Sequence, residues 1–513
     1  MCGIFGFSTP AGDSLQLNKI ADSMGEAIAH RGPDSKGQWF EPGSRFCLGH
    51  RRLSIIDTSS AGHQPMESEC GRFVLVFNGE IYNFRKVKAL LPTEVKKGDW
   101  SGESDTEVLL KALIHLGIQE TLEVIDGMFA FALLDRQSRT ICLARDRFGE
   151  KPLYIYSKGG AFAFSSELKA IEAYTNDLSL NPLAIDSLLK YSYIGDSLSI
   201  FKEVRKLSAG HFLMINVDDP SNIPDSVPYW EIEDSILEGM SKRKEVHSVE
   251  SYVSQTEALL KSSIEERMIS DVPLGAFLSG GIDSTVIVAL MQEVSSNKVS
   301  TFSIGFHDKN YNEAHHAAEV AKHIGTSHHE FYLNASEMLD VVPSLSDIYS
   351  EPFADSSQLP TLMVSQQARR HVTVALTGDS GDEVFGGYNR YLWGPRVHSK
   401  FSKVPKGARN LVKKMMLSFS PASYDTLMNA VNSTSSKSKQ VSRLGDKVHK
   451  LAGILDFDSQ QDIYDSLIRV NSRELLSLSG SKYSENSSRF FDNDDLSFVE
   501  KMMAFDTVGY MQN

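Results

Sequence analysis

The chain has 513 residues, of which 41% are hydrophobic and 23% charged, the composition of a globular protein with room for two or three domains. It has 52 lysine and arginine residues and 66 aspartate and glutamate residues, which gives a net charge of −14. Because there is also no long basic run, we do not expect nucleic acid as a partner. No apolar run approaches the roughly 18 residues of a membrane helix, so we expect a cytoplasmic protein without a membrane partner.

The first predicted strand, GIFGF, directly follows Cys2. Removal of Met1 would leave Cys2 with a free α-amine, whose reference pKa is about 7.7–8.0, and a thiol, whose reference pKa is about 8.5, so one residue could supply base and nucleophile. By position alone, a small apolar residue packed in a strand is the commoner role. The other cysteines, Cys47, Cys70 and Cys142, show no metal-binding spacing, which predicts free thiols.

Short runs of β-forming residues dominate residues 2–215, which we take as the first domain. Two stretches, 18–30 and 104–117, show helical periodicity, and Ser104 is the expected N-cap of the second. Many strands with few crossover helices predict an α+β domain of antiparallel sheets. The strand candidates are GIFGF, RFCLGHRRLSII, RFVLVFNGEIY, MFAFALLD, TICLARD, PLYIYS, AFAFSSE and HFLMINV.

Residues 216–247, rich in Asp, Pro, Ser and charge, form the predicted linker to a second domain at 248–513. In that domain strand candidates alternate with helical stretches, which predicts an α/β doubly wound parallel sheet. The tail beyond about Lys400 has helical periodicity, and we expect that the chain is cut inside a helical region at Asn513. The alternating segments are PLGAFL, STVIVALMQEV, VSTFSIGF, EAHHAAEVAKHIG and VTVALTGD.

The strongest motif is LSGGIDS, which spans Leu278–Ser284 between a predicted strand and a predicted helix. Its two glycines let backbone amides approach an anion closely, and the helix N-terminus adds a favourable dipole. The motif therefore predicts a phosphate-binding loop, although the Walker A pattern is absent. An ordinary turn and helix cap is the alternative.

A second glycine- and acid-rich segment, TGDSGDEVFGGY at Thr377–Tyr388, follows another predicted strand. In a doubly wound sheet ligands bind at the carboxyl ends of the strands, so both segments can face one nucleotide site. Asp283 and Asp382 would then hold Mg²⁺ on the phosphates of the nucleotide. Two solvated surface loops are the alternative. The histidine-rich stretch 315–329 lacks partners at ligand spacing and predicts a helix surface and a strand start.

Three segments of the first domain could complete a site around Cys2. Asn78 and Gly79 offer a side-chain amide and a backbone N–H to a developing oxyanion. Arg52 could pair with a substrate carboxylate and Asp105 with a substrate ammonium. Taken singly, each residue is more often a turn residue, a surface charge or a helix cap.

Together these motifs resemble the glutamine-hydrolysing asparagine synthetase family. MCGIFGF, HRGPD, RLSIID, NGEIYN and SDTE are similar to the glutaminase of that family, a domain like the N-terminal-nucleophile hydrolases. LSGGIDS and TGDSGDEVFGGY are similar to its ATP-pyrophosphatase synthetase domain. Either motif set alone occurs in other enzymes, whereas both in this order point to a much smaller group.

The resemblance implies a ligase with two sites. In the first, Cys2 would attack the side-chain amide of glutamine, with Asn78 and Gly79 stabilising the oxyanion, and ammonia would pass inside the protein to the second. The residues implied for binding glutamine are Arg52, Leu53, Ser54, Ile55, Ile56, Asn78, Gly79, Glu80 and Asp105.

In the second site, a carboxylate acceptor, most simply aspartate, would be activated by ATP to an acyl-adenylate and then converted to asparagine. Asp379 is implied in forming the adenylate, and Asp283 and Asp382 in binding Mg²⁺. The expected assembly is a homodimer. The residues implied for binding ATP are Phe277, Ser279, Gly280, Gly281, Ile282, Asp283, Ser284, Ile304, Thr377 and Gly378.

The acceptor and the synthetase step are the open points. The segment EPFADSSQLPT at Glu351–Thr361 lies where the acceptor should bind and is similar to homologues linked to surface polysaccharides, so a uronic acid is an alternative acceptor. Thr377 and Ser380 replace residues that the family more often has as Ser and Gly. The family also continues past Asn513 with a helical segment, so a glutaminase or regulatory homologue without synthetase turnover is a further alternative.

Overall fold

The computed structural model describes residues 1–10, 13–195, 197–243, 248–307, 312–432, 444–455, 457–470 and 488–512. The chain forms two compact units. No helix among the described residues combines the length and the apolar character that crossing a bilayer requires. The first unit comprises Met1–Leu188, Tyr193–Asp379 and Gln512–Asn513, and the second comprises Leu189–Ser192 and Ser380–Met511.

Two six-stranded antiparallel sheets form the N-terminal part of the first unit. The first sheet has the order β10 (Val204–Lys206), β8 (Tyr154–Lys158), β9 (Ala161–Ser165), β1 (Gly3–Ser8), β3 (Phe46–Arg52) and β2 (Ser35–Phe40). The second sheet has the order β12 (Val227–Pro228), β11 (His211–Asn216), β7 (Thr140–Arg145), β6 (Gly127–Asp135), β5 (Phe73–Ile81) and β4 (Met66–Glu67).

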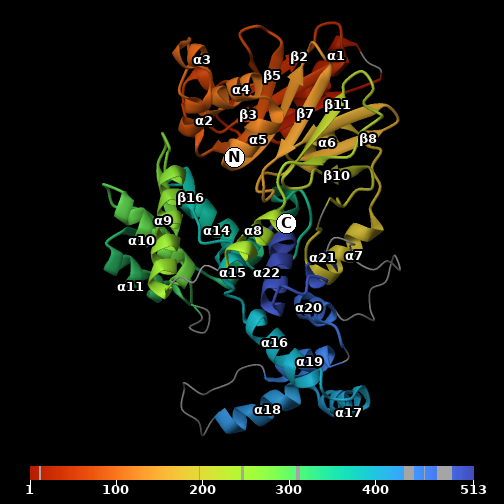
Figure 1. Ribbon diagram of the computed structural model, residues 1–513, viewed down its shortest axis with the longest axis vertical. Helices are drawn as coiled ribbons and strands as arrows, with labels where there is room; N and C mark the ends of the chain where they lie inside the picture. The colour runs from red at the N-terminus through yellow and green to blue at the C-terminus, as the bar shows by residue number, and fades with distance from the viewer. Residues whose placement is uncertain are drawn as a thin grey trace. The chain divides into compact units, whose positions relative to one another are not determined.

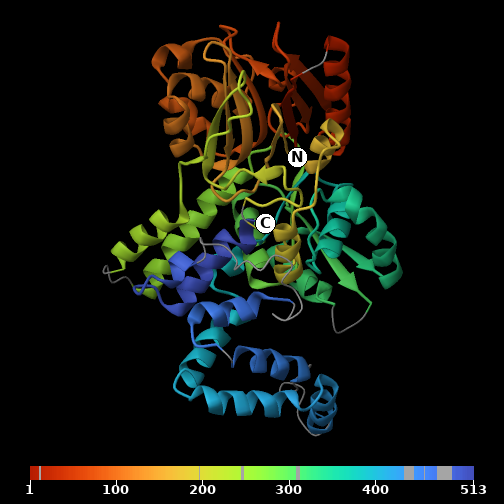
Figure 2. The ribbon, with the colours of Figure 1, turned by 90° about the vertical axis from the view of Figure 1, so that its right-hand side faces the viewer.

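The two sheets pack face to face, with helices on both outer sides (Figures 1 and 2). Because side chains alternate along a strand, Ile4 lies in the core between the sheets while Phe5 packs against the outer helices α1 (Ser14–Ala27) and α6 (Leu168–Tyr174). This confirms the predicted layered α+β domain. The outer face of the second sheet packs on α2 (Phe84–Leu90), α4 (Asp105–His115) and α5 (Ile118–Val124), and α3 (Thr93–Lys97) lies between α2 and α4 in the chain.

A four-stranded parallel sheet completes the first unit. Its order is β15 (Ser327–Leu333), β14 (Ser300–Phe306), β13 (Leu274–Phe277) and β16 (Val374–Leu376). One face packs on α9 (Val249–Arg267), α10 (Ile282–Val294) and α11 (Ala314–Ile324), and the other packs on α14 (Gln358–Ala368). Helices on both faces of a parallel sheet confirm the predicted doubly wound class.

The second unit is helical, as expected for the tail. Its core contains the carboxylate of Asp506, which accepts hydrogen bonds from the hydroxyls of Tyr391 and Tyr464, both at 2.5 Å, and from Arg390 Nε at 2.9 Å. These side chains join three helices. The helices of the second unit are α15 (Gly381–Phe385), α16 (Asn389–Phe401), α17 (Lys406–Leu417), α18 (Pro421–Asn432), α19 (Leu444–Ile454), α20 (Gln460–Ile468), α21 (Ser488–Phe491) and α22 (Phe498–Val508).

Local differences from the expected elements are small. The strand expected to reach Ile56 ends at Arg52, because its partners β1 and β2 reach no further: Gly3 pairs with Arg51 and Ser35 with Arg52. The next two N–H groups, of Leu53 and Ser54, donate to side chains. The segment taken as a linker contains β12 and α8 (Ile232–Lys242), and its residues 244–247 lie outside the described residues. The remaining helices are α7 (Pro182–Tyr191), α12 (Ala335–Val341) and α13 (Leu345–Ile348).

Candidate active site

A pocket lies at the start of β1, beside β5 of the facing sheet. The period-two alternation of strands explains its position, because Cys2 shares a face with Ile4, and Asn78 and Glu80 share a face with Val76, in the core between the sheets. The lining residues are Met1, Cys2, Arg52, Leu53, Ile55, Ile56, Gln64, Phe77, Asn78, Gly79, Glu80, Asp105, Thr106, Met128 and Lys151.

The pocket brings together every residue predicted for the glutamine site except Ser54. The backbone N–H of Ser54 instead donates to Asp34 Oδ2 at 2.8 Å, which fixes the loop after β3. Residues more than a hundred positions apart in the chain therefore surround Cys2. The predicted residues in the lining are Cys2, Arg52, Leu53, Ile55, Ile56, Asn78, Gly79, Glu80 and Asp105.

The thiol of Cys2 faces the loop after β3. Leu53 N–H donates to Cys2 Sγ at 3.4 Å, and Arg31 Nε donates to the Cys2 carbonyl at 2.8 Å. Burial raises the pKa of the Cys2 thiol, and the Leu53 N–H opposes this effect. Burial also lowers the pKa of the Met1 α-amine to about 5, so this amine is largely neutral at pH 7.

The side chain of Asn78 is fully buried, yet neither its Oδ1 nor its Nδ2 has a hydrogen-bond partner among the described residues. An unpartnered buried amide costs roughly 1–3 kcal/mol, so such a group requires an explanation. Its place in the pocket supplies one, because its N–H₂ can donate to a ligand oxygen near Cys2. Gly79 has no room for a side chain, since a Cβ would collide with the carbonyl of Met128 on β6.

Two buried carboxylates lie on the same pocket wall. Asp105 begins α4, whose N-cap Ser104 accepts the Glu107 N–H at 3.3 Å, and Asp105 Oδ2 accepts the Ile81 N–H at 2.9 Å. Burial raises the pKa of Asp105 to about 6. Burial, and then the charge of Asp105, raise the pKa of Glu80 to about 7. A bound ammonium group would lower both pKa values again, so these two acids have the chemistry that holding a cation requires.

The guanidinium of Arg52 is buried beside the same pocket. It donates to the carbonyl of Ser59 at 2.6 Å and to the carbonyl of Asp57, and it forms no ion pair with any described residue. A cation held only by carbonyls can still bind a carboxylate with a strong charge-assisted hydrogen bond. Arg52 and the two acids thus match the two charged groups of an amino acid.

Sequence reasoning missed several lining residues. Lys151 Nζ is buried 2.9 Å from Met128 Sδ and 3.2 Å from Met1 Sδ. Gln64 Oε1 accepts the Phe77 N–H at 2.6 Å, and its Nε2 donates to the Thr106 hydroxyl at 3.3 Å. Neither Lys151 nor Gln64 carries a local sequence signal that marks it as buried in a pocket.

A second candidate site lies at the carboxyl edge of the parallel sheet. β13 runs into the loop Ser279–Gly281, which leads to α10. The Ser279 and Ser284 hydroxyls are 2.9 Å apart, and Gly281 N–H donates to Ser279 Oγ at 3.2 Å. Gly280 has a φ of 83°, and a Cβ there would lie 2.9 Å from the Ala317 nitrogen. This compact backbone cradle before a helix of 13 residues fits a nucleotide phosphate.

The end of β16 lies against the same loop. A Cβ at Gly378 would lie 2.6 Å from the Ser284 nitrogen, and the Thr377 hydroxyl donates to Asp379 Oδ2 at 2.8 Å. Phe277, the last residue of β13, and Ile304, within the neighbouring β14, pack against the same core cluster on the α14 face of the sheet. The structure therefore brings the predicted residues of the first unit together here, namely Phe277, Ser279, Gly280, Gly281, Ile282, Asp283, Ser284, Ile304, Thr377, Gly378 and Asp379.

The oxygen donors fit a magnesium ion that accompanies a nucleotide. Mg²⁺ usually takes one or two carboxylates together with substrate phosphates, and Asp283 lies in the first turn of α10 beside the cradle. No cluster of three or more potential metal ligands occurs among the described residues. Asp382 belongs to α15 of the second unit, where a Cβ on Gly387 would collide with its carboxylate. Its part in binding Mg²⁺ stays a prediction.

In the comparison with known proteins, each half of the chain matches a protein family. Residues 1–230 match the glutamine amidotransferase domain, and residues 255–513 match asparagine synthase. The chain belongs to the asparagine synthase family. It is 36% identical over 437 residues to a protein of Methanocaldococcus jannaschii named as a second glutamine-hydrolysing asparagine synthetase, covering 81% of each chain.

Two bacterial members of the asparagine synthase family match over the same share of this chain. Asparagine synthetase 1 of Bacillus subtilis is 32% identical, with 81% of this chain and 63% of that one covered. An asparagine synthetase of Mycobacterium tuberculosis is 33% identical, with 81% and 64% covered. The chain therefore spans a little under two thirds of these two relatives. Membership of the family supports a glutamine-dependent amidation as the reaction class.

Proposed function

We propose that this protein is an ATP-dependent ligase that transfers nitrogen from glutamine to a carboxylate, with aspartate as the acceptor and asparagine as the product. The observation that carries the proposal is the unpartnered, fully buried amide of Asn78 in the pocket of Cys2. A pocket that keeps an amide donor beside a thiol suits acyl transfer. The phosphate cradle of the same unit supports the ATP-dependent half.

In the glutaminase half, Cys2 Sγ attacks the side-chain amide carbon of glutamine, and its proton passes to the α-amine of Cys2 once Met1 is removed. The negative charge that develops on the amide oxygen is stabilised by Asn78 Nδ2 and the Gly79 N–H. The carbon–nitrogen bond then breaks, the leaving nitrogen takes the proton, and ammonia is released. Water hydrolyses the Cys2 thioester to glutamate.

The remaining charges of the pocket orient the substrate. Arg52 binds the α-carboxylate of glutamine, and Glu80 and Asp105 bind its α-ammonium group. The raised pKa values of these two acids, to about 7 and about 6, express the cost of keeping them buried without such a cation. Glutamine binding thus supplies the ion pairs that the pocket otherwise lacks.

In the synthetase half, the carboxylate of the acceptor attacks the α-phosphorus of ATP and displaces pyrophosphate, which gives an acyl-adenylate. Ammonia attacks the acyl carbon, AMP leaves, and the amide remains. The backbone amides of Ser279–Ser284 hold the phosphates, and Asp379 acts at adenylate formation. Mg²⁺, held in part by Asp283, would neutralise charge on the phosphates when bound.

The test is product formation by the full chain with glutamine, ATP, magnesium chloride and aspartate. We expect glutamate, asparagine, AMP and pyrophosphate in equal amounts. A parallel reaction with a nucleotide-sugar uronate in place of aspartate tests the other acceptor class that the segment Glu351–Thr361 leaves open. Pyrophosphate release with the uronate alone would replace the acceptor, and glutamate release without pyrophosphate in either reaction would contradict the ligase.

A further inference from the structure

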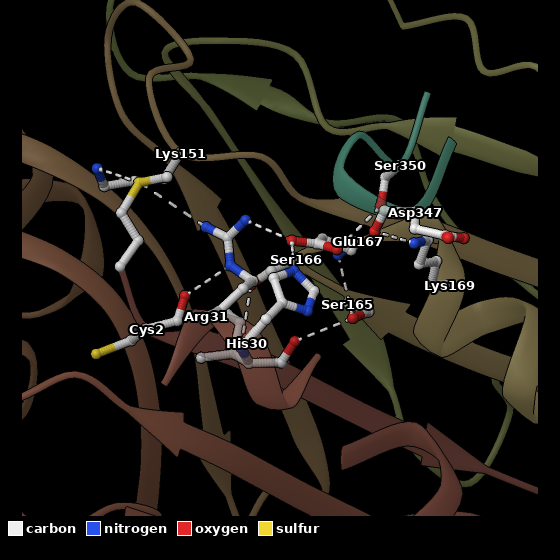
Figure 3. A network of polar contacts seen from close by, with 12 residues as sticks. Cys2, His30, Arg31, Lys151, Ser165, Ser166, Glu167, Lys169, Asp347 and Ser350 are labelled. Carbon is white, nitrogen blue, oxygen red and sulfur yellow. Dashed lines mark hydrogen bonds and ion pairs between the residues drawn. The ribbon is translucent and has the colours of Figure 1, made fainter. Parts of the chain in front are cut away.

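A buried carboxylate, Glu167, lies two residues after the end of β9 and binds side chains from two distant parts of the first unit (Figure 3). Its Oε1 accepts Arg31 Nη1 at 2.8 Å and lies 3.0 Å from His30 Nε2. Its Oε2 accepts the hydroxyl of Ser350 at 3.2 Å. Each oxygen of this carboxylate therefore serves a different partner segment.

On the first side, the network reaches the backbone of the nucleophile. The side chain of Arg31 is also buried, and its Nε donates to the carbonyl of Cys2 at 2.8 Å. The two residues before Glu167 bind β1, the strand that follows Cys2. Ser166 Oγ accepts the Ile4 N–H at 3.0 Å, and Ser165 Oγ donates to the Ile4 carbonyl at 3.2 Å. Figure 3 shows Arg31 between Cys2 and Glu167. The segment 165–167 thus sets the position of Cys2.

On the second side, Ser350 belongs to a segment that follows α13 and directly precedes Glu351, the first residue of the segment where we expect acceptor binding. This segment lies on the glutaminase surface at further points. Lys169 Nζ donates to the Asp347 carbonyl, and the Ile200 N–H donates to Glu351 Oε1 at 2.8 Å. Glu351 Oε2 also pairs with Lys206 Nζ at 2.9 Å. A displacement of this segment would change the contacts of the Glu167 carboxylate.

We propose that Glu167 is a positioning residue that couples the segment Asp347–Glu351 to the reactivity of Cys2. The continuous path runs from the Ser350 hydroxyl through the Glu167 carboxylate and the Arg31 guanidinium to the Cys2 carbonyl. Charge-assisted hydrogen bonds of this kind are strong and directional, so a shift of one partner reorients the next. The proposal rests on the proposed function for its purpose, which is to link events at the acceptor side with glutamine hydrolysis.

Replacing Ser350 distinguishes coupling between the two segments from simple structural support of the Glu167 network. Arg31, His30 and Glu167 all belong to the glutaminase half and would hold one another without it, because Glu167 Oε1 alone contacts both Arg31 and His30. Replacing Ser350 by alanine therefore removes the direct hydrogen bond to Glu167 Oε2 and leaves the Arg31–Glu167 ion pair in place. Ser344→Ala is the matched control, since the Ser344 hydroxyl donates only within its own segment, to the Val341 carbonyl at 2.7 Å.

The experiment is a double-mutant cycle on the full chain, read out as the rate at which iodoacetamide alkylates Cys2, measured by mass spectrometry of the N-terminal peptide. No substrate is added, so a failure of the proposed synthetase reaction would not affect this result. We expect Ser350→Ala to change the rate about threefold or more, within the range of ordinary coupling energies, and to have no effect in a Glu167→Gln background. Ser344→Ala should match the wild type.

Two results would overturn the proposal. One is an unchanged alkylation rate in Ser350→Ala, and the other is the same change in the wild-type and Glu167→Gln backgrounds, which would show that Ser350 acts by another route. If Glu167→Gln fails to fold, Arg31→Lys takes its place in the cycle, because it keeps the charge and loses the Nε contact with the Cys2 carbonyl. Pyrophosphate release with ammonia, ATP and aspartate is measured separately and reports only on the proposed function.

Discussion

The backbone N–H of Asp57 donates to the carboxylate of Asp271 at 2.8 Å. In return, the Asp271 N–H donates to the Ile55 carbonyl at 3.0 Å. Asp57 ends the loop that lines the Cys2 pocket, and Asp271 precedes β13, which leads into the phosphate cradle. This pocket-lining loop is therefore held by a residue of the part of the chain that matches asparagine synthase.

Asp271→Ala should raise the KM for glutamine in the glutaminase reaction, by about threefold to tenfold for the loss of one charge-assisted hydrogen bond. The kcat should change less, because Asp271 touches no reacting group. Asp271→Asn is the control, since its amide oxygen can still accept the Asp57 N–H. Equal KM values for Asp271→Ala and the wild type would show that the loop holds its shape without this contact.

Asn78→Leu should separate stability from activity. Removing an unpartnered buried amide should leave the free energy of unfolding unchanged or raise it by about 1 kcal/mol, while losing an oxyanion donor should lower the glutaminase kcat by about 10²–10³-fold. Gln64→Leu is the matched contrast, because the Gln64 amide is bonded on both sides and its loss should destabilise the fold. A destabilised but active Asn78→Leu variant would contradict the assigned role.

The effect of Glu80→Gln on the stability of the fold should depend on pH. The folded-state pKa of Glu80, about 7, lies above the usual 4.5, so the folded chain binds more protons than the unfolded chain between these pH values. The stability that this group contributes is therefore present below pH 4.5 and lost as the pH rises through 7. Relative to the wild type, Glu80→Gln should therefore be more stable at pH 8, by up to about 3 kcal/mol, and equally stable at pH 4.5. It should also bind glutamine more weakly.

Thermal melting at the two pH values measures this difference. Glu94→Gln, at an exposed site on α3, should melt like the wild type at both. A Glu80→Gln variant that gains no stability at pH 8 would mean that the buried carboxylate already has a cation partner, which Lys151 would have to supply.

Gly378→Ala should impair the synthetase half alone. The added Cβ would lie 2.6 Å from the Ser284 nitrogen, so β16 or the first turn of α10 must move. We expect the KM for ATP in the ammonia-supported reaction to rise about tenfold or more, with the glutaminase rate unchanged. Gly407→Ala, where a Cβ meets open space, is the control. An unchanged KM would place the nucleotide away from this contact.

The sequence allowed much of this arrangement to be predicted, because period-two alternation and the strand-to-helix signature of the phosphate loop are local properties. Cys2 and Asn78 could be grouped only through the combination of motifs, since their proximity depends on the packing of two sheets. The apolar residues after Arg52 continue the strand pattern, whereas the turn at Asp57 is imposed by a hydrogen bond from Arg52 to the Asp57 carbonyl and by one from the Asp57 N–H to the Asp271 carboxylate. Lys151 was missed because nothing local marks a lysine as buried.

In the proposed function, Cys2 releases nitrogen from glutamine, and the product is built at the second site. The most direct measurement is amide formation by Cys2→Ala with glutamine or with ammonium chloride as nitrogen donor, each with ATP and aspartate. We predict that glutamine-supported synthesis is abolished while ammonia-supported synthesis stays within about twofold of the wild type. Glutamine-supported synthesis that survives in Cys2→Ala, or loss of both reactions in a folded protein, would contradict the two-site account.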